Sequence, residues 1–139
     1  MCSELEIDAF FVTTENLPVK NINKLQSLPN FNKLTSVNIN KLIHVVFIAK
    51  GYGVDNSGKT NLELDLKIIS PSNKILFAQE KFSVMKIIRQ KEMFVVFDPM
   101  LDFMIESGDE LGKYSVSTRV IDSASKDAKV KNISINVQQ

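Results

Sequence analysis

An alternation of apolar and charged residues between positions 62 and 68 constrains the fold more than any other feature of this chain. The apolar members are Leu62, Leu64, Leu66 and Ile68, and the residues between them are Glu63, Asp65 and Lys67. Successive side chains of a β-strand point to opposite faces, so on a strand the four apolar residues share one face, whereas a helix would scatter them around its axis. The segment therefore predicts a strand with one buried and one solvated face.

Related patterns predict further strands over 5–12, 42–49, 75–82, 93–97, 101–105, 114–120 and 133–137. The run over 42–49 is almost continuously apolar, which is typical of a strand buried on both faces. Pro71-Ser72-Asn73-Lys74 predicts a turn that joins the 62–70 and 75–82 strands into a hairpin. We predict no long amphipathic helix, and 84–92 forms either a short helix or an irregular crossover.

About seven strands separated by turn signals predict an all-β, immunoglobulin-like antiparallel β-sandwich. A chain of 139 residues has the length of one domain, so we expect a single sandwich domain over 1–139. The segment 15–40 is rich in Asn and Lys and contains Pro18 and Pro29. We expect a long irregular loop or an extra edge element there, and loops on a rigid sandwich often bind partners.

The composition excludes several classes of protein and site. Cys2 is the only cysteine and His44 the only histidine, so the chain can form neither an internal disulfide nor a usual structural zinc site. The formal net charge of +1 lacks the basic excess of nucleic-acid-binding proteins. No run approaches the roughly 18–20 apolar residues that span a bilayer, so we expect no transmembrane segment.

The N-terminus leaves two alternatives for localisation. Residues 1–20 lack the charged and apolar regions of a signal peptide. If Met1 is the native start, the protein is cytoplasmic. If the chain begins after a removed signal, Cys2 is a candidate lipid-anchor site of a bacterial lipoprotein in the periplasm or cell envelope.

One segment matches the phosphate-binding motif G-x-x-x-x-G-K-[ST], namely Gly53-Val54-Asp55-Asn56-Ser57-Gly58-Lys59-Thr60. In a nucleotide hydrolase, Lys59 would reach the terminal phosphates, Thr60 would bind magnesium, and Asp98 would support the ion. Phosphate binding also needs a helix that begins at Lys59, but the residues after Thr60 alternate with the period of a strand. We therefore interpret the segment as an inter-strand loop and keep a nucleotide hydrolase with Gly53, Gly58, Lys59, Thr60 and Asp98 as the alternative.

Other candidate chemistry is sparse. His44 lies inside the most apolar predicted strand, which indicates a buried structural histidine. A group of carboxylates offers hard oxygen ligands, but its spacing matches no calcium loop, so we predict no metal and no cofactor; its members are Asp98, Asp102, Glu106, Asp109 and Glu110. The chain has no Trp and two Tyr, so the sequence does not predict an exposed aromatic platform for sugars.

The stretch from Ile105 to Val116 resembles the start of strand F in immunoglobulin-like sandwiches, where a tyrosine hydroxyl bonds back to the backbone at a chain corner. Tyr114 would have this structural role, with Gly112 two residues before it. More broadly, residues 40–137 resemble small bacterial envelope proteins. The resemblance implies a non-enzymatic protein-interaction or accessory module of the envelope that binds another protein, with no catalytic residues. The nucleotide hydrolase remains the alternative function.

Overall fold

The computed structural model describes residues 5–13, 33–50, 52–53, 55–86, 94–97 and 101–139. These residues form nine strands in two sheets and no helix. The predicted all-β sandwich is therefore confirmed, with more strands than the seven expected. Within the described ranges no helix is long and apolar enough to cross a membrane.

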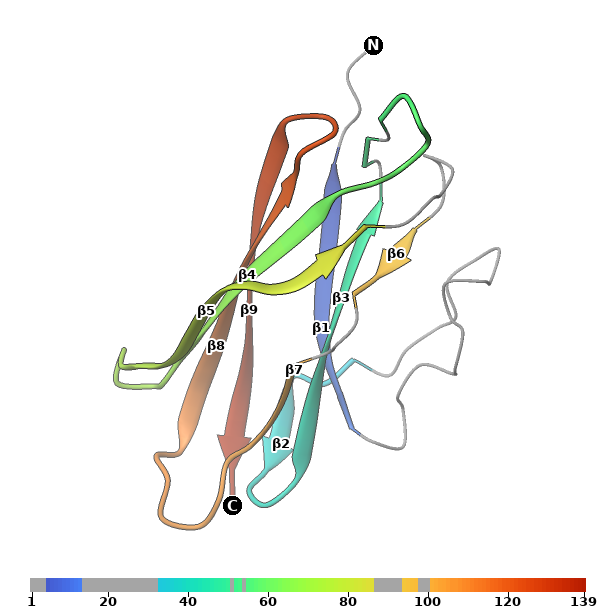
Figure 1. Cartoon of the computed structure of the whole chain (residues 1–139). Helices are drawn as coiled ribbons and strands as arrows, with labels where there is room; N and C mark the ends of the chain where they lie inside the picture. Colours follow the sequence, from blue (N-terminus) through green and yellow to red (C-terminus); the bar gives the residue numbers. More distant parts are fainter. Residues whose placement is uncertain (1–4, 14–32, 51, 54, 87–93, 98–100) are drawn as a thin grey trace.

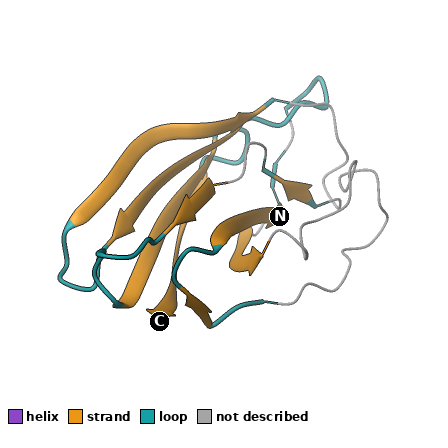
Figure 2. Cartoon of the chain, turned by 90° about the horizontal axis from the view of Figure 1, so that it is seen from below, coloured by secondary structure: helices purple, strands orange, loops and turns teal. Residues whose placement is uncertain are grey.

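The two sheets form the two layers of the sandwich (Figures 1 and 2). The first sheet contains β1 (Glu6–Thr13), β3 (Leu42–Lys50), β6 (Val95–Val96) and β7 (Leu101–Met104), with β6 and β7 pairing with opposite ends of β3. The second has the order β2 (Ser36–Asn38), β9 (Asp127–Gln138), β8 (Gly112–Asp122), β4 (Leu62–Ile69) and β5 (Ile75–Met85). All pairs are antiparallel except β2 with β9, which is parallel, so the second sheet is mixed.

Strands β3 and β4 have the burial that their sequences predict. The alternating apolar residues of β4 are buried, and its charged residues are more exposed. In β3, all residues between the two ends are buried. Alternate residues of β3, such as Val45 and Phe47, belong to the core between the sheets, while Val46 and Ile48 belong to a second apolar cluster on the other face of the first sheet. A strand that contacts apolar groups on both faces gains from a continuous apolar run.

The predicted hairpin of β4 and β5 is also confirmed. The amide of Ser70 donates to the carbonyl of Lys74 at 2.8 Å, and Asn73 has a φ of 68°. Asparagine tolerates this left-handed backbone better than most residues, so the turn residues fit the geometry that they adopt.

The two sides of the sandwich differ. On one side, residues 33–38 run from the first sheet to the second: Leu34 donates to the carbonyl of Phe11 in β1 at 2.8 Å, and β2 then pairs with β9. The predicted extra edge element therefore exists as β2, while residues 15–32 of the 15–40 segment lie outside the described residues, as do 87–92 of the expected short helix or crossover. On the opposite side, β5 pairs with no described strand except β4.

Candidate functional site

The motif over residues 53–60 forms a closed turn with its own internal acceptor. The Asp55 carboxylate accepts hydrogen bonds from the amides of Ser57 and Lys59 at 2.9 and 3.0 Å and from the Ser57 hydroxyl at 2.7 Å. These bonds, first that from the Ser57 side chain, lower the pKa of Asp55 because they stabilise its charged form. The amides of Ser57 and Lys59 therefore already bind an anion, and that anion is part of the protein.

Gly53 is bound by a second carboxylate. Its amide donates to Asp122 at 2.6 Å, and Asp122 is completely buried. Asp122 also accepts the Ser125 hydroxyl at 2.7 Å and the amide of Ala124 at 3.1 Å. A Cβ at position 53 would lie 2.9 Å from the backbone nitrogen of Ser125, so the close approach of two loops requires glycine here.

The nucleotide-hydrolase alternative is therefore wrong. The residues that follow Thr60 form strand β4, whereas a phosphate site needs a helix N-terminus at this point. The Thr60 side chain is buried rather than presented to solvent. Asp98, the proposed magnesium ligand, lies outside the described residues.

Tyr114 and Gly112 lie at the corner that leads into β8. The Tyr114 hydroxyl donates to the carbonyl of Glu110 at 2.6 Å. Burial, followed by the nearby charges of Asp109 and Glu110, raises the pKa of the Tyr114 phenol. Gly112 has a φ of 129°, and Pro71 of the β4–β5 turn lies 3.2 Å from the position that a Cβ would occupy. The corner therefore connects β8 to the hairpin.

The remaining sequence candidates that the structure describes do not converge on a site. His44 is buried in β3 and its Nδ1 lies 2.6 Å from an oxygen of Asp102 in the adjacent strand β7, so this carboxylate orients the ring. Within the described ranges no three His, Cys, Asp or Glu side chains converge as metal ligands. Cys2 lies outside these ranges.

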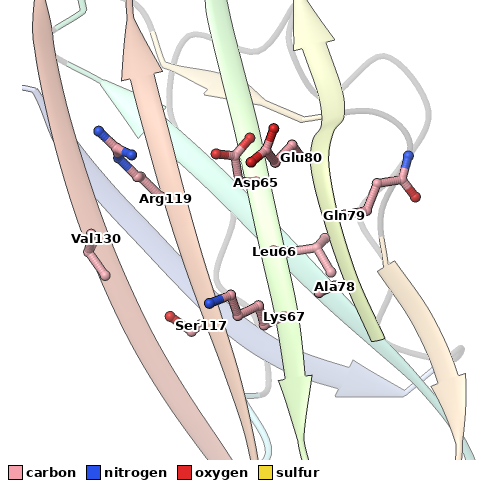
Figure 3. A pocket seen from close by; sticks show the side chains of 9 residues that line it. All are labelled: Asp65, Leu66, Lys67, Ala78, Gln79, Glu80, Ser117, Arg119 and Val130. Atoms are coloured by element: carbon pink, nitrogen blue, oxygen red, sulfur yellow. The ribbon is translucent and has the colours of Figure 1, made fainter. Parts of the chain in front are cut away.

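The structure does show a polar groove on the outer face of the second sheet (Figure 3). Its volume is about 550 Å³, and the residues that line it come from four adjacent strands: Asp65, Leu66, Lys67, Ala78, Gln79, Glu80, Ser117, Arg119 and Val130. We call this the sheet groove. The sequence offered one signal for it, because charged and polar residues occupy the outward positions of the strands over 62–69 and 114–120.

A bulge in β5 shapes one end of the sheet groove. Leu66 pairs with Gln79 and Leu64 pairs with Ser83, so three residues of β5 lie opposite Asp65 alone. Lys81 has a φ of 53°, and its amide donates to the Asp65 carboxylate at 2.8 Å. A bulge redirects side chains at the edge of a sheet, and here Glu80 lines the same groove as Asp65.

Most polar side chains of the sheet groove have no partner in the described part of the protein. Asp65 accepts the amide of Lys81, but the side chains of Lys67, Gln79, Glu80, Ser117 and Arg119 make no hydrogen bond or ion pair with any described residue. Asp65 and Arg119 lie directly opposite each other on β4 and β8 without forming an ion pair. A ligand could therefore bind these groups without breaking a contact between described residues.

No family model and no curated protein matches this sequence. Among solved structures, the chain is similar to a family 123 glycoside hydrolase from Clostridium perfringens, studied for its hydrolysis of glycolipid glycans. The TM-score is 0.51 at 12% identity, over 96% of this chain and 28% of that one. It also matches a β-glucosidase from Listeria innocua with a TM-score of 0.44 at 18% identity, over 99% of this chain and 16% of that one.

The similarity to the family 123 enzyme contradicts the functional prediction made from the sequence. A non-enzymatic interaction module was expected, but the solved structure that matches this fold with a TM-score of 0.51 is a glycoside hydrolase. The sequence could not reveal this, because at 12% identity the likeness lies in the arrangement of strands rather than in shared residues. The chain spans only 28% of the length of the family 123 enzyme.

Proposed function

We propose that this chain is the β-sandwich domain of a glycan-hydrolysing enzyme, and that the sheet groove holds a saccharide portion of the substrate. The observation that carries this proposal is a set of polar side chains in one groove, most of which have no partner among the described residues. Binding groups gain most when they are held in place before the ligand arrives, and these side chains project from paired strands.

The groove has the chemistry that a saccharide requires. Asp65 and Glu80 can accept hydrogen bonds from hydroxyl groups, while Lys67 and Arg119 can donate to hydroxyl or ring oxygens. Bonds with a charged partner are roughly twice as strong as those between neutral groups. No aromatic residue is among the described residues that line the groove, so recognition would rest on hydrogen bonds rather than on stacking against a ring.

The fold comparison supports the enzymatic context. The family 123 enzyme hydrolyses glycolipid glycans, and 96% of this chain matches 28% of it, a domain-sized portion. In this proposal the sandwich positions the saccharide and a catalytic unit cleaves it. Precise positioning of a substrate contributes strongly to catalysis, so the domain would serve the enzymatic reaction directly.

The test is a titration of the ¹⁵N-labelled chain with the free oligosaccharide head groups of glycolipids, followed by NMR. We expect amide shifts that saturate and that cluster on β4, β5 and β8 around the groove. Arg119→Ala and Glu80→Gln should each weaken binding about tenfold, because each removes a charge-assisted hydrogen bond.

The matched control is Lys113→Ala. Lys113 is exposed on β8 and faces the same side as Arg119, six residues away, or about 20 Å at ~3.3 Å per residue. Binding should survive this change. Absence of saturable shifts with every head group, or an equal loss in Lys113→Ala, would refute the proposal.

A further inference from the structure

The side of the sandwich where β5 is the last described strand carries a second groove, separate from the sheet groove. It lies between β5 of one sheet and β7 of the other, with a volume of about 650 Å³. We call it the edge groove. Its apolar lining comprises Ile68, Leu76, Phe77, Phe82, Leu101, Phe103, Met104, Ile105 and Tyr114, and its two charged lining residues, Asp102 and Asp109, are both acidic.

Several apolar side chains that line the edge groove are exposed. Leu76 is 54% exposed, Phe77 37% and Met104 40%. Among the described strands, β5 is the fifth of its sheet and β7 pairs only with β3 of the other sheet, so no described strand continues either sheet on this side. Contiguous exposed apolar patches on globular proteins often mark interaction sites.

The chain itself contains a segment that complements the edge groove. The β4–β5 hairpin projects from the body of the sandwich (Figure 1), and its turn residue Lys74 is followed by Ile75 and Leu76 at the start of β5. Lys74 is exposed and Ile75 is 61% exposed. A cation followed by apolar side chains matches an apolar groove whose described charged lining residues are both carboxylates.

We propose that the edge groove is the contact surface of a homodimer, in which the hairpin of each copy packs against the edge groove of the other. A two-fold contact requires one patch that is complementary to itself. This surface meets that requirement, because it combines exposed apolar side chains and the carboxylates of Asp102 and Asp109 with the positively charged Lys74. The inference goes beyond the proposed saccharide site and uses a different face.

Packing of side chains, rather than pairing of strand edges, makes the contact. The middle of β5 carries the bulge at Lys81, where the backbone departs from a regular edge. A bulge and a lysine at an edge strand both hinder the addition of another strand. The apolar residues on either side of the bulge, Phe77 and Phe82, face the edge groove and remain available.

The test is sedimentation velocity over about 1 µM to about 1 mM, the range in which weak specific dimers dissociate. We expect a monomer–dimer equilibrium within it. Leu76→Ser should weaken the dimer at least about tenfold, as truncation of a central apolar contact does. The control Val130→Ser, at a residue 62% exposed outside the edge groove, should leave the dissociation constant unchanged.

Charge reversal gives an independent test of the dimer. Lys74→Glu should weaken the dimer, and adding Asp109→Lys should restore part of the affinity, because the pair is again of opposite sign. Thermal unfolding would verify that each variant is folded. If Leu76→Ser does not fold, Met104→Ser takes its place. A chain that stays monomeric throughout, or a dimer that Val130→Ser weakens as much as Leu76→Ser does, would overturn the proposal.

Discussion

Replacement of Asp122 by alanine should be one of the most destabilising substitutions in this protein. The Asp122 carboxylate has no exposed surface, and it accepts a 2.6 Å bond from the Gly53 amide and a 2.7 Å bond from the Ser125 hydroxyl. A hydrogen bond to a charged group contributes about 1.5–3 kcal/mol, and a buried donor left without a partner costs about as much. We therefore expect Asp122→Ala to lower the free energy of unfolding by about 3–5 kcal/mol.

The assay is urea unfolding followed by far-ultraviolet circular dichroism. Since small domains have a free energy of unfolding of about 5–15 kcal/mol, a loss of this size is readily measured. Asp122→Asn should lose less, about 1–3 kcal/mol, because one acceptor remains while the new NH₂ group faces donors.

The control is Asp127→Ala, which removes the carboxylate opposite Asp122 across the same turn. Among the described residues, the Asp127 side chain accepts a hydrogen bond only from the next amide in the chain, so the loss should be below about 0.5 kcal/mol. If Asp122→Ala unfolds within about 0.5 kcal/mol of the unmodified protein, the bonds to Gly53 and Ser125 do not hold the two loops together, and the reasoning fails.

Three further predictions concern the same loops and the corner at β8. Gly53→Ala should lower the free energy of unfolding by about 1–3 kcal/mol in urea, because its Cβ would lie 2.9 Å from the Ser125 backbone nitrogen; no loss would contradict this close approach. The raised pKa of Tyr114 favours the neutral phenol in the folded state, so the free energy of unfolding should fall as the pH rises above about 10. Tyr114→Phe should reduce this fall in alkaline unfolding curves. The lowered pKa of Asp55 favours its charged form, so stability should fall as the pH drops below about 4, and Asp55→Ala should flatten acid unfolding in that range; unchanged curves would refute the role of its turn.

The local patterns of the sequence predicted the strands well. The alternation over 62–68 gave both the strand and its buried face, and the apolar run over 42–49 indicated burial on both faces. The turn at 71–74 followed from its residue types. These features depend on neighbours within a few positions, and the periodicity of a strand records directly which side chains face the core.

The same local sequence patterns could not predict the candidate site. The sheet groove combines Asp65, Glu80 and Arg119, which approach one another only through the pairing of β4 with β5 and β8. The bulge that brings Glu80 beside Asp65 depends on the register between two strands. A change of register by one residue would move every side chain to the opposite face, and no single segment specifies that register.

The phosphate-binding motif shows the same difference between local sequence patterns and contacts that the tertiary structure sets. The motif has glycine, lysine and threonine at the required spacing, but phosphate binding depends on which groups the backbone amides contact. In the folded chain the Gly53 amide faces Asp122, which lies 69 residues away. The sequence by itself determined the strands, their faces and the hairpin turn, because these follow from local sterics and burial. Only the tertiary structure decided which polar groups meet, because strand pairing sets contacts between residues far apart in the chain.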